Sequence, residues 1–264
     1  MWLSPGRAFD IGFDGEAAVV ENARAQCRGD VNAVALAGRR KKLLVADMDS
    51  TIITCECLDE LADQAGLRSQ IAVLTERAMR GEIEFEAALR ARVALLKGLP
   101  LAALERTWRQ RVRLTPGAAA LVGTMRAAGA ASLLVTGGFA YFAQRVAQQV
   151  GFDRFQANRL LDDGVALTGL VAEPILGRDA KRAALESECA RLGIGSADAL
   201  AVGDGANDLG MVKAAGLGVA FHAKPALAQA ACAIVAHADL TALLYLQGYS
   251  DAQIKRLYPS FSAT

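Results

Sequence analysis

Lys42-Leu-Leu-Val-Ala-Asp-Met-Asp-Ser-Thr51 is the stretch of this 264-residue chain that decides the fold. Its apolar run, Leu43 to Ala46, predicts a short buried strand of a parallel sheet. The run ends at Asp47, and Asp49 and two hydroxyl residues follow. Ligands of open α/β sheets bind beyond the carboxyl ends of the strands, so these side chains face a candidate site. The alternative is that the two aspartates only form a polar turn.

The overall composition predicts a globular protein with one substantial core and a smaller domain. Of the 264 residues, 53% are hydrophobic, and the formal net charge is +1. This charge gives no reason to expect nucleic acid or a membrane surface as a partner. No apolar run is long enough for a membrane span, and five scattered cysteines are typical of reduced thiols, so we expect a cytoplasmic protein.

Further strands alternate with segments of helical spacing, which indicates an α/β fold with a parallel sheet. The other predicted strands are short and apolar: residues 131–135, 199–202, 217–221 and 233–235. A β-hairpin is expected at residues 160–171, around Asp162-Asp163-Gly164. Residues 31–36 are a weaker strand candidate within the first 40 residues, which are too few for an independent domain.

Residues 57–114 have the spacing of helices, and one arginine lies in an unexpected place there. A stripe with a period of 3.6 residues consists of Phe85, Ala88, Leu89, Arg92 and Leu96. An arginine on an apolar stripe is costly unless it is paired or meets an anionic ligand. An internal ion pair and a bound anion are both compatible with this position.

Polar residues also follow two of the other predicted strands. Thr136 and Gly137 follow one strand, and Asp204 and Asp208 follow another. The carboxyl ends of parallel strands share one edge of the sheet, so we expect these residues to converge with Asp47. Oxygen ligands without nearby histidine or cysteine suit Mg²⁺.

A lysine and a turn that contains a hydroxyl residue and two glycines complete the set of groups needed for phosphoryl transfer. Lys181 lies in the first turn of a predicted helix, where cations are mildly disfavoured, although a solvated lysine is the commoner explanation. The turn at Thr136 precedes a helix and offers backbone N–H groups to an anion. Carboxylates, magnesium, a lysine and an anion-binding turn together describe a phosphoryl-transfer site.

Several other chemistries are disfavoured by the sequence. No cysteine is followed six positions later by arginine, no Gly-Lys dipeptide exists, and only His222 and His237 could supply imidazoles. Carboxylates must therefore carry any acid–base work. The loop from Gly203 to Asp208 is unlike a dinucleotide site, because Asp208 stands where its last glycine belongs.

The sequence resembles the haloacid-dehalogenase-type phosphatases in four successive motifs. These are Asp-Met-Asp-Ser-Thr at 47–51, Thr-Gly-Gly-Phe at 136–139, Lys181, and Gly-Asp-Gly-Ala-Asn-Asp at 203–208. Glu56 and the segment from Arg77 to Val93 narrow the resemblance to the phosphoserine phosphatase family. The resemblance covers roughly residues 40–245.

This resemblance implies a Rossmann-like parallel sheet core with a small helical cap inserted after the first strand. The implied phosphatase core comprises residues 41–56 and 115–246, and the implied cap comprises residues 57–114. Residues 1–40 are similar to a remnant of the N-terminal domain that many bacterial members carry, and residues 247–264 form a C-terminal tail. A homodimer is among the expectations.

The resemblance also implies the chemistry. Asp47 is expected to be the nucleophile that forms an aspartyl-phosphate, and Asp49 the acid that protonates the leaving oxygen and later activates water. Mg²⁺ is expected to be bound by the Asp47 carboxylate, the Asp49 backbone carbonyl and Asp204, with support from Asp208. The implied reaction is the hydrolysis of O-phosphoserine to serine and phosphate, the last step of serine biosynthesis.

The remaining implied residues bind this small-molecule substrate. The residues expected to contact the phosphoryl group are Thr136, Gly137, Lys181 and Asn207. The residues expected to contact the serine part are Glu56 and Arg92, which bind the amino and carboxylate groups, and Met79 and Phe85, which line the cap. The family usually has serine where this chain has Thr136, so the hydroxyl is kept while the packing differs.

Two other functions remain open on the sequence alone. A phosphotransferase would pass the phosphoryl group to homoserine or another small alcohol, and the four motifs do not separate such an acceptor from water. A receiver-like binding module would also accept phosphate on an aspartate. A cap that carries Glu56 and Arg92 favours a closed small-molecule site over such a module.

Overall fold

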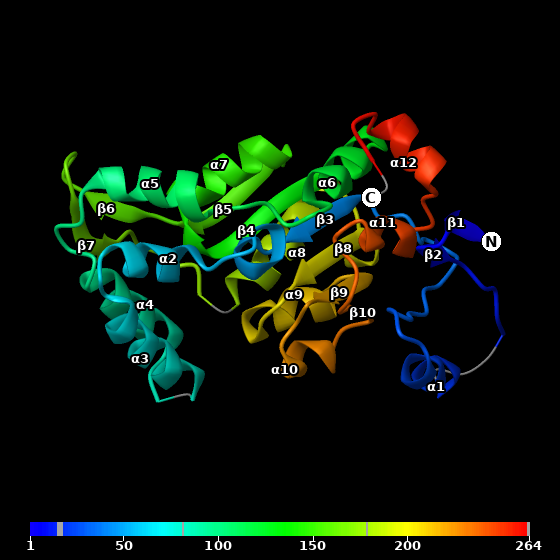
Figure 1. The fold of residues 1–264 in the computed structure, drawn as a ribbon, viewed down its shortest axis with the longest axis horizontal. Helices are drawn as coiled ribbons and strands as arrows, with labels where there is room; N and C mark the ends of the chain where they lie inside the picture. The colour runs from blue at the N-terminus through cyan, green and yellow to red at the C-terminus, as the bar shows by residue number, and fades with distance from the viewer. Residues whose placement is uncertain (15–17, 81, 178, 263–264) are drawn as a thin grey trace.

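The computed structural model describes residues 1–14, 18–80, 82–177 and 179–262. Its centre is a six-stranded sheet in which every neighbouring pair of strands is parallel (Figure 1). In spatial order the strands are β10 (Ala233–Val235), β9 (Leu217–Phe221), β8 (Ala199–Gly203), β3 (Leu43–Ala46), β4 (Ala131–Phe139) and β5 (Arg154–Asn158). The strand order reverses at β3, so the end of β3 is the topological switch point where ligands of such sheets bind. The α/β class with a Rossmann-like parallel sheet is confirmed.

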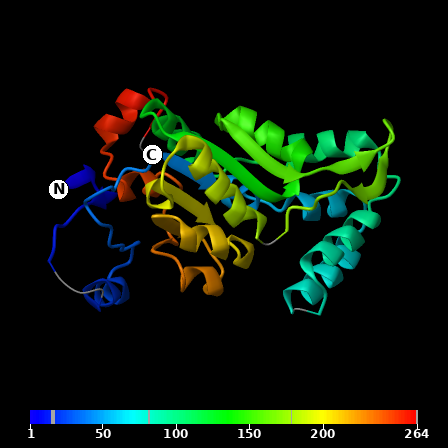
Figure 2. The ribbon, with the colours of Figure 1, turned by 180° about the vertical axis from the view of Figure 1, so that it is seen from behind.

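Helices cover both faces of this sheet (Figures 1 and 2). One face carries α6 (Ala118–Ala127) and α7 (Ala140–Val150), and the other carries α8 (Ala180–Leu192), α9 (Leu209–Ala214) and α10 (Pro225–Ala228). Side chains alternate between these layers along each strand. Leu44 packs toward α6 and α7, and its neighbour Val45 packs toward α8 and α9. Burial on both faces explains why β3 is apolar without interruption.

A helical insert leaves the sheet between β3 and β4. Its helices are α2 (Cys57–Gln64), α3 (Arg68–Met79), α4 (Phe85–Ala94) and α5 (Leu101–Arg111). The two segments that connect the insert to the sheet run antiparallel, since the Thr54 N–H donates to the Arg113 carbonyl at 3.0 Å and Ile53 pairs with Leu114. The helices α3 and α4 project from one end of the molecule as an antiparallel pair (Figure 1).

The insert is supported by a hairpin of β6 (Leu160–Asp162) and β7 (Leu167–Val171), as expected from the sequence. Gly169 of β7 has φ 78°, and a β-carbon there would lie 2.8 Å from Lys97 Cβ and 3.2 Å from the Ala94 carbonyl oxygen. Only glycine allows this close approach and this backbone conformation together. The end of α4 is therefore seated directly on the hairpin backbone.

The N-terminal residues are attached to the edge of the sheet. They include β1 (Trp2–Ser4), β2 (Ala8–Phe9) and α1 (Ala18–Gln26). The prediction of a strand at 31–36 was wrong, because the side chain of Asn32, rather than a strand backbone, bonds to the N–H and carbonyl groups of Ile234 in β10. This contact covers part of an open sheet edge. The helices α11 (Ala242–Leu246) and α12 (Asp251–Leu257) follow β10.

The edge strand β5 was not predicted. Its sequence, Arg-Phe-Gln-Ala-Asn, is largely polar because the strand has a neighbour on one side only. The strand β4 is also longer than predicted, since its backbone reaches Phe139, which pairs with Asn158 after an irregularity. No helix among the described residues is both long and apolar enough to cross a membrane.

Candidate active site

Asp47 lies directly beyond β3, at the centre of the sheet edge. Its N–H donates to the Val202 carbonyl at 3.0 Å, which continues the parallel pairing of β3 with β8 by one residue. The residue is 4% exposed. The Met48 N–H donates to Asp47 Oδ1 at 2.8 Å, and Lys181 Nζ lies 2.6 Å from the same oxygen. One carboxylate oxygen is thus held firmly and the carboxylate has a fixed direction.

Lys181 connects two of the predicted carboxylates. Its ammonium lies 2.6 Å from Asp47 Oδ1 and 2.5 Å from Asp208 Oδ1, and the residue is buried in the first turn of α8. The alternative of a solvated lysine is therefore wrong. Burial alone would lower the pKa of Lys181, but Asp47 and Asp208 outweigh burial and raise it, so the ammonium stays charged.

The loop after β8 positions Asp208 by its backbone. Asp208 Oδ2 accepts the N–H groups of Asp204 at 3.1 Å and Gly205 at 3.0 Å. A β-carbon on Gly203 would lie 2.3 Å from Asp208 Cγ, so glycine is required for the carboxylate to fold back against the strand end. The buried carboxylate of Asp208 thereby has hydrogen bonds to both of its oxygens.

Three carboxylates form a cluster that could hold a metal ion. One oxygen from each of Asp47, Asp204 and Asp208 lies within 4.8 Å of the others. Burial first, and repulsion from Asp208 second, raise the pKa values of Asp47 and Asp204. Lys181 is the one ammonium that pairs with this cluster within the described chain. A hard divalent cation fits an excess of buried carboxylate oxygens of this kind.

Asp49 is engaged separately from the three-carboxylate cluster. Its Oδ2 accepts the Thr136 hydroxyl at 3.0 Å, and its Oδ1 accepts the Cys57 N–H at 2.9 Å, at the N-terminus of α2. Burial raises the pKa of Asp49, although these hydrogen bonds oppose the shift. A raised pKa favours a carboxyl group that carries a proton to a leaving oxygen.

The turn at Thr136 is held from two sides. The Gly138 N–H donates to Thr136 Oγ1 at 2.8 Å, and the side-chain amide of Asn158 donates to the Gly137 carbonyl at 2.8 Å. Asn158 also accepts the Leu176 N–H at 2.7 Å, so this buried amide joins two walls of the site. Asn158 was missed by the sequence reasoning because the strand that carries it was not predicted.

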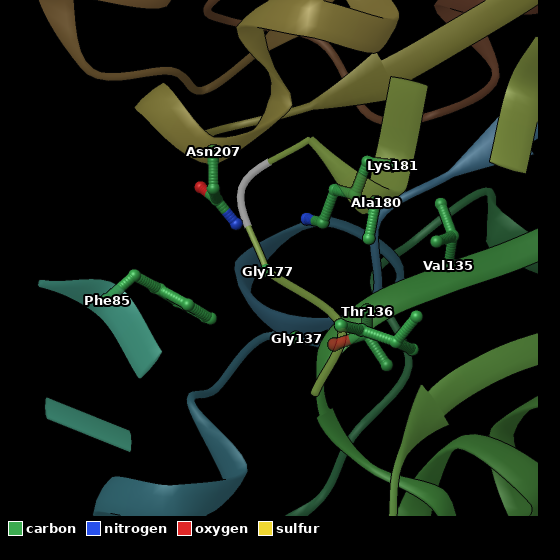
Figure 3. Close-up of a pocket in the computed structure, with 9 residues that line it drawn as sticks. Phe85, Val135, Thr136, Gly137, Gly177, Ala180, Lys181 and Asn207 are labelled. Carbon is green, nitrogen blue, oxygen red and sulfur yellow. The ribbon is translucent and has the colours of Figure 1, made fainter. Parts of the chain in front are cut away.

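The predicted phosphoryl-binding residues surround one small pocket (Figure 3). In Figure 3 the Lys181 amine and the Asn207 amide point from above toward the space beside Thr136 and Gly137, and Phe85 points into it from α4. The tip of the Phe85 ring lies 3.3 Å from where a β-carbon on Gly137 would be. The core and the insert therefore meet directly over this pocket.

Arg92, the arginine on the apolar stripe, is half-buried on α4. Its Nε donates to the Ala88 carbonyl at 3.2 Å, and its Nη1 lies 3.5 Å from Thr75 Oγ1. No carboxylate among the described residues forms a salt bridge with it, whereas its exposed neighbour Arg90 bonds to Glu173 at 2.8 Å. Burial lowers the pKa of Arg92, and Asp59 and Glu56 oppose this. The absence of an internal partner favours a bound anion at Arg92.

Glu56 supplies a negative charge on the same side of the site. The Ser50 hydroxyl donates to Glu56 Oε1 at 2.8 Å. Glu56 is exposed as a residue, but partial desolvation of its carboxylate, together with the charge of Asp49, raises its pKa to about 7. Met79, the remaining residue predicted to line the cap, ends α3, and its side chain lies outside the described part of the chain.

The comparisons with known proteins agree with this geometry. Residues 44–213 match the family model of haloacid dehalogenase-like hydrolases. The chain belongs to the haloacid dehalogenase-like hydrolase family. Within that family, the chain is 46% identical over 210 residues to the phosphoserine phosphatase of Polaromonas sp. strain JS666. The aligned region covers 78% of this chain and 89% of that protein.

Two solved structures resemble this haloacid dehalogenase-like hydrolase closely. A substrate-bound phosphoserine phosphatase complex has a TM-score of 0.73 and 38% identity, and a phospho-aspartyl intermediate analogue of phosphoserine phosphatase has a TM-score of 0.72 and 39% identity. Each structural alignment covers 78% of this chain and 98% of the solved phosphoserine phosphatase chain. The resemblance noted in the sequence is confirmed at the level of the family.

Proposed function

We propose that this haloacid dehalogenase-like hydrolase cleaves O-phosphoserine to serine and phosphate through a phosphate ester of Asp47. The observation that carries this proposal is Arg92, a half-buried guanidinium on α4 that forms no salt bridge with any described carboxylate. Asp59 and, more weakly, Glu56 act on its charge from nearby. A cation and an anion beside a phosphoryl site match the carboxylate and ammonium of phosphoserine.

The first step is the attack of Asp47 on phosphorus. Met48 and Lys181 hold Oδ1, and within the described chain Oδ2 accepts no hydrogen bond, so Oδ2 is the attacking oxygen. The bond between phosphorus and the serine oxygen breaks as the bond to Oδ2 forms. Asp49 gives its proton to the departing serine oxygen, which would otherwise leave as an unstable alkoxide.

The second step releases phosphate and restores both aspartates. Asp49, now a carboxylate, removes a proton from a water molecule, and the hydroxide attacks phosphorus. The bond between phosphorus and Asp47 breaks, which returns the free carboxylate. The Cys57 N–H holds the Asp49 carboxylate through both steps and keeps it aimed at the reacting oxygen. The Thr136 hydroxyl, which bonds to Asp49 in the free protein, turns to the phosphoryl group when substrate binds.

We further propose Mg²⁺ as the cofactor. Its ligands would be the carboxylates of Asp47 and Asp204 and the backbone carbonyl of Asp49, with support from Asp208. Support comes from the three-carboxylate cluster and its raised pKa values. When bound, the cation would neutralise charge between the nucleophile and the phosphoryl oxygens.

The remaining residues of the site recognise the substrate in this proposal. Thr136, the Gly137 N–H and Lys181 bind the phosphoryl oxygens, with Asn207 beside them, as their place around the pocket in Figure 3 supports. Glu56 binds the ammonium group. Residues 57–114 would act as the cap over this site, with Phe85 closing it above Gly137.

The proposed function is tested by phosphate release from O-phosphoserine with Mg²⁺, with and without added homoserine. Hydrolysis predicts one inorganic phosphate for each serine formed, with no effect of homoserine. The appearance of phosphohomoserine at the expense of phosphate would establish the phosphotransferase instead. Cleavage of p-nitrophenyl phosphate without any cleavage of phosphoserine would contradict the assigned substrate.

Three further expectations, on the pathway, the cellular location and the oligomeric state, complete the proposal. We place the reaction at the end of serine biosynthesis, since its product is serine. A cytoplasmic location is supported by the five free cysteines. Homodimerisation is testable by sedimentation of the purified chain, and a monomer at working concentration would contradict it.

A further inference from the structure

Ser50 holds an unfavourable backbone conformation beside Asp49. Its φ is 55° and its ψ is 4°, and within the described chain only His222 shares a positive φ among residues other than glycine. Residues with a β-carbon rarely adopt this left-handed region, and such strain persists where the surroundings enforce it. The strain lies in the loop that carries both proposed catalytic aspartates.

The strained residue directs its hydroxyl at Glu56. Ser50 Oγ donates to Glu56 Oε1 at 2.8 Å, and the Ser50 N–H donates to the Cys55 carbonyl at 3.3 Å. Within the described chain this hydroxyl is the one hydrogen-bond donor to the Glu56 carboxylate, which forms no salt bridge there. Glu56 Oε2 is therefore left available to a ligand.

The same short loop is closed at its base by Asp49. The Cys57 N–H donates to Asp49 Oδ1 at 2.9 Å, so the residues at the two ends of the loop are held together. A hydrogen bond between two side chains connects Ser50 and Glu56 across this loop. A hydrogen bond from the Cys57 backbone to the Asp49 side chain connects the ends of the loop. The position of the Glu56 carboxylate is thus tied to that of Asp49.

We propose that Ser50 is a positioning residue for the substrate's ammonium group. It acts through Glu56, by fixing one carboxylate oxygen so that the other faces the ammonium at a set distance from Asp49. This inference rests on the proposed function, because phosphoserine supplies the ammonium. It explains why a strained serine stands where glycine would be less strained: glycine would relax the backbone but lacks the hydroxyl.

The test compares Ser50→Ala and Ser50→Gly with the wild type on three substrates. These are O-phosphoserine, its analogue without the amino group, and p-nitrophenyl phosphate. We expect KM for phosphoserine to rise about tenfold in both variants, as for a lost hydrogen bond to a charged group. The loss on the two substrates without an amine should be several times smaller. Ser50→Gly should also melt at or above the wild-type temperature, because its strain is relieved.

A double-mutant cycle with Glu56→Gln separates positioning from a general structural role. If Ser50 acts through Glu56, the loss caused by Ser50→Gly should largely disappear in the Glu56→Gln background. Equal losses in both backgrounds, or equal losses on all three substrates, would overturn the inference. If the wild type does not cleave phosphoserine, the proposed function fails, whereas normal wild-type turnover with an unchanged KM in Ser50→Gly rejects the role of Ser50 alone.

Discussion

The backbone of Gly138 and the carboxylate of Asp49 are packed so closely that a β-carbon on Gly138 would lie 2.6 Å from Asp49 Oδ2. The same β-carbon would lie 3.0 Å from Thr136 Oγ1, which donates to that carboxylate oxygen. Glycine at this position therefore makes room for the proposed proton donor. A methyl group there would displace Asp49, because atoms do not approach so closely.

Gly138→Ala should reduce kcat for phosphoserine by about 100-fold or more, as for other misplaced catalytic groups. The matched control is Gly137→Ala, whose β-carbon would meet only the tip of the Phe85 ring at 3.3 Å, a side chain on another element that can shift. This control should mainly raise KM. Equal effects of the two variants on kcat, in folded protein by circular dichroism, would contradict the role given to Gly138.

Asp47→Asn should abolish turnover while the protein remains folded, because an amide is a poor nucleophile toward phosphorus. Its thermal stability without metal should be no lower than that of the wild type, because burial and Asp208 disfavour the Asp47 charge more than Lys181 favours it, and Lys181 keeps its ion pair with Asp208. Phosphate release is the measurement, with a melting curve as the control for folding. Substantial phosphate release by the folded variant would remove the covalent mechanism.

Arg92→Ala should cost about 2–4 kcal/mol in kcat/KM for phosphoserine, as for other truncated buried charge pairs. Turnover of p-nitrophenyl phosphate, which has no carboxylate of this kind, should change little. Arg90→Ala is the matched control on the same helix, because Arg90 is exposed and pairs with Glu86 and Glu173 instead. Parallel losses on both substrates, with a lowered melting temperature, would show that Arg92 holds the insert together.

The pH dependence of kcat/KM should report the ionisation of Glu56. Burial and the Asp49 charge raise its pKa to about 7, so in the free enzyme the carboxylate is neutral below that pH and charged above it. Because only the charged form attracts an ammonium, kcat/KM for phosphoserine should rise between about pH 6 and pH 8.

Two controls isolate this effect. The second ionisation of a phosphate ester also falls near pH 6, so the profile is compared with that of the analogue without the amino group. Glu56→Gln should remove the difference between the two profiles. A difference that persists in Glu56→Gln would assign the titration to another group.

Removal of divalent cations should stop turnover, and Mg²⁺ should restore it. A second readout is stability, because a cation bound between Asp47 and Asp204 would offset the repulsion that Asp208 exerts on both and raise the melting temperature. Asp204→Asn should lose most of this stabilisation by Mg²⁺. Unchanged turnover after thorough chelation would refute the metal assignment.

The candidate site could largely be predicted from the sequence because its residues follow apolar strands. Asp47, Thr136 and Asp204 each come after a run that is buried on both faces, and such runs are visible without a structure. Parallel pairing then brings the strand ends to one edge. The helical character of residues 57–114 was likewise predicted from spacing, whereas their place as an inserted cap was implied by the family resemblance.

Contacts that depend on edges and loops could not be predicted. The strand β5 is largely polar because it pairs with one neighbouring strand only. Its apolar content and residue spacing therefore did not predict a strand, and Asn158, which it carries, was missed as well. The left-handed turn at Ser50 leaves no trace in a sequence that has serine rather than glycine. The choice between an ion pair and a free guanidinium at Arg92 also required the positions of side chains on other helices.

The antiparallel connections between the sheet and the helical insert bear on how such an enzyme can evolve. The Thr54 N–H reaches the Arg113 carbonyl at 3.0 Å, and the Thr115 N–H reaches the Ile52 carbonyl at 2.9 Å, so the chain leaves and re-enters the sheet at one place. Because the two ends of the insert lie next to each other, a change in its length or sequence adds little to the entropic cost of closing this loop on the sheet. The proposed phosphoryl-transfer residues and the part of the recognition surface that the insert carries can therefore diverge at different rates. An exchange of residues 57–112, which keeps Glu56, offers a route to phosphatases for other small molecules that carry an ammonium group.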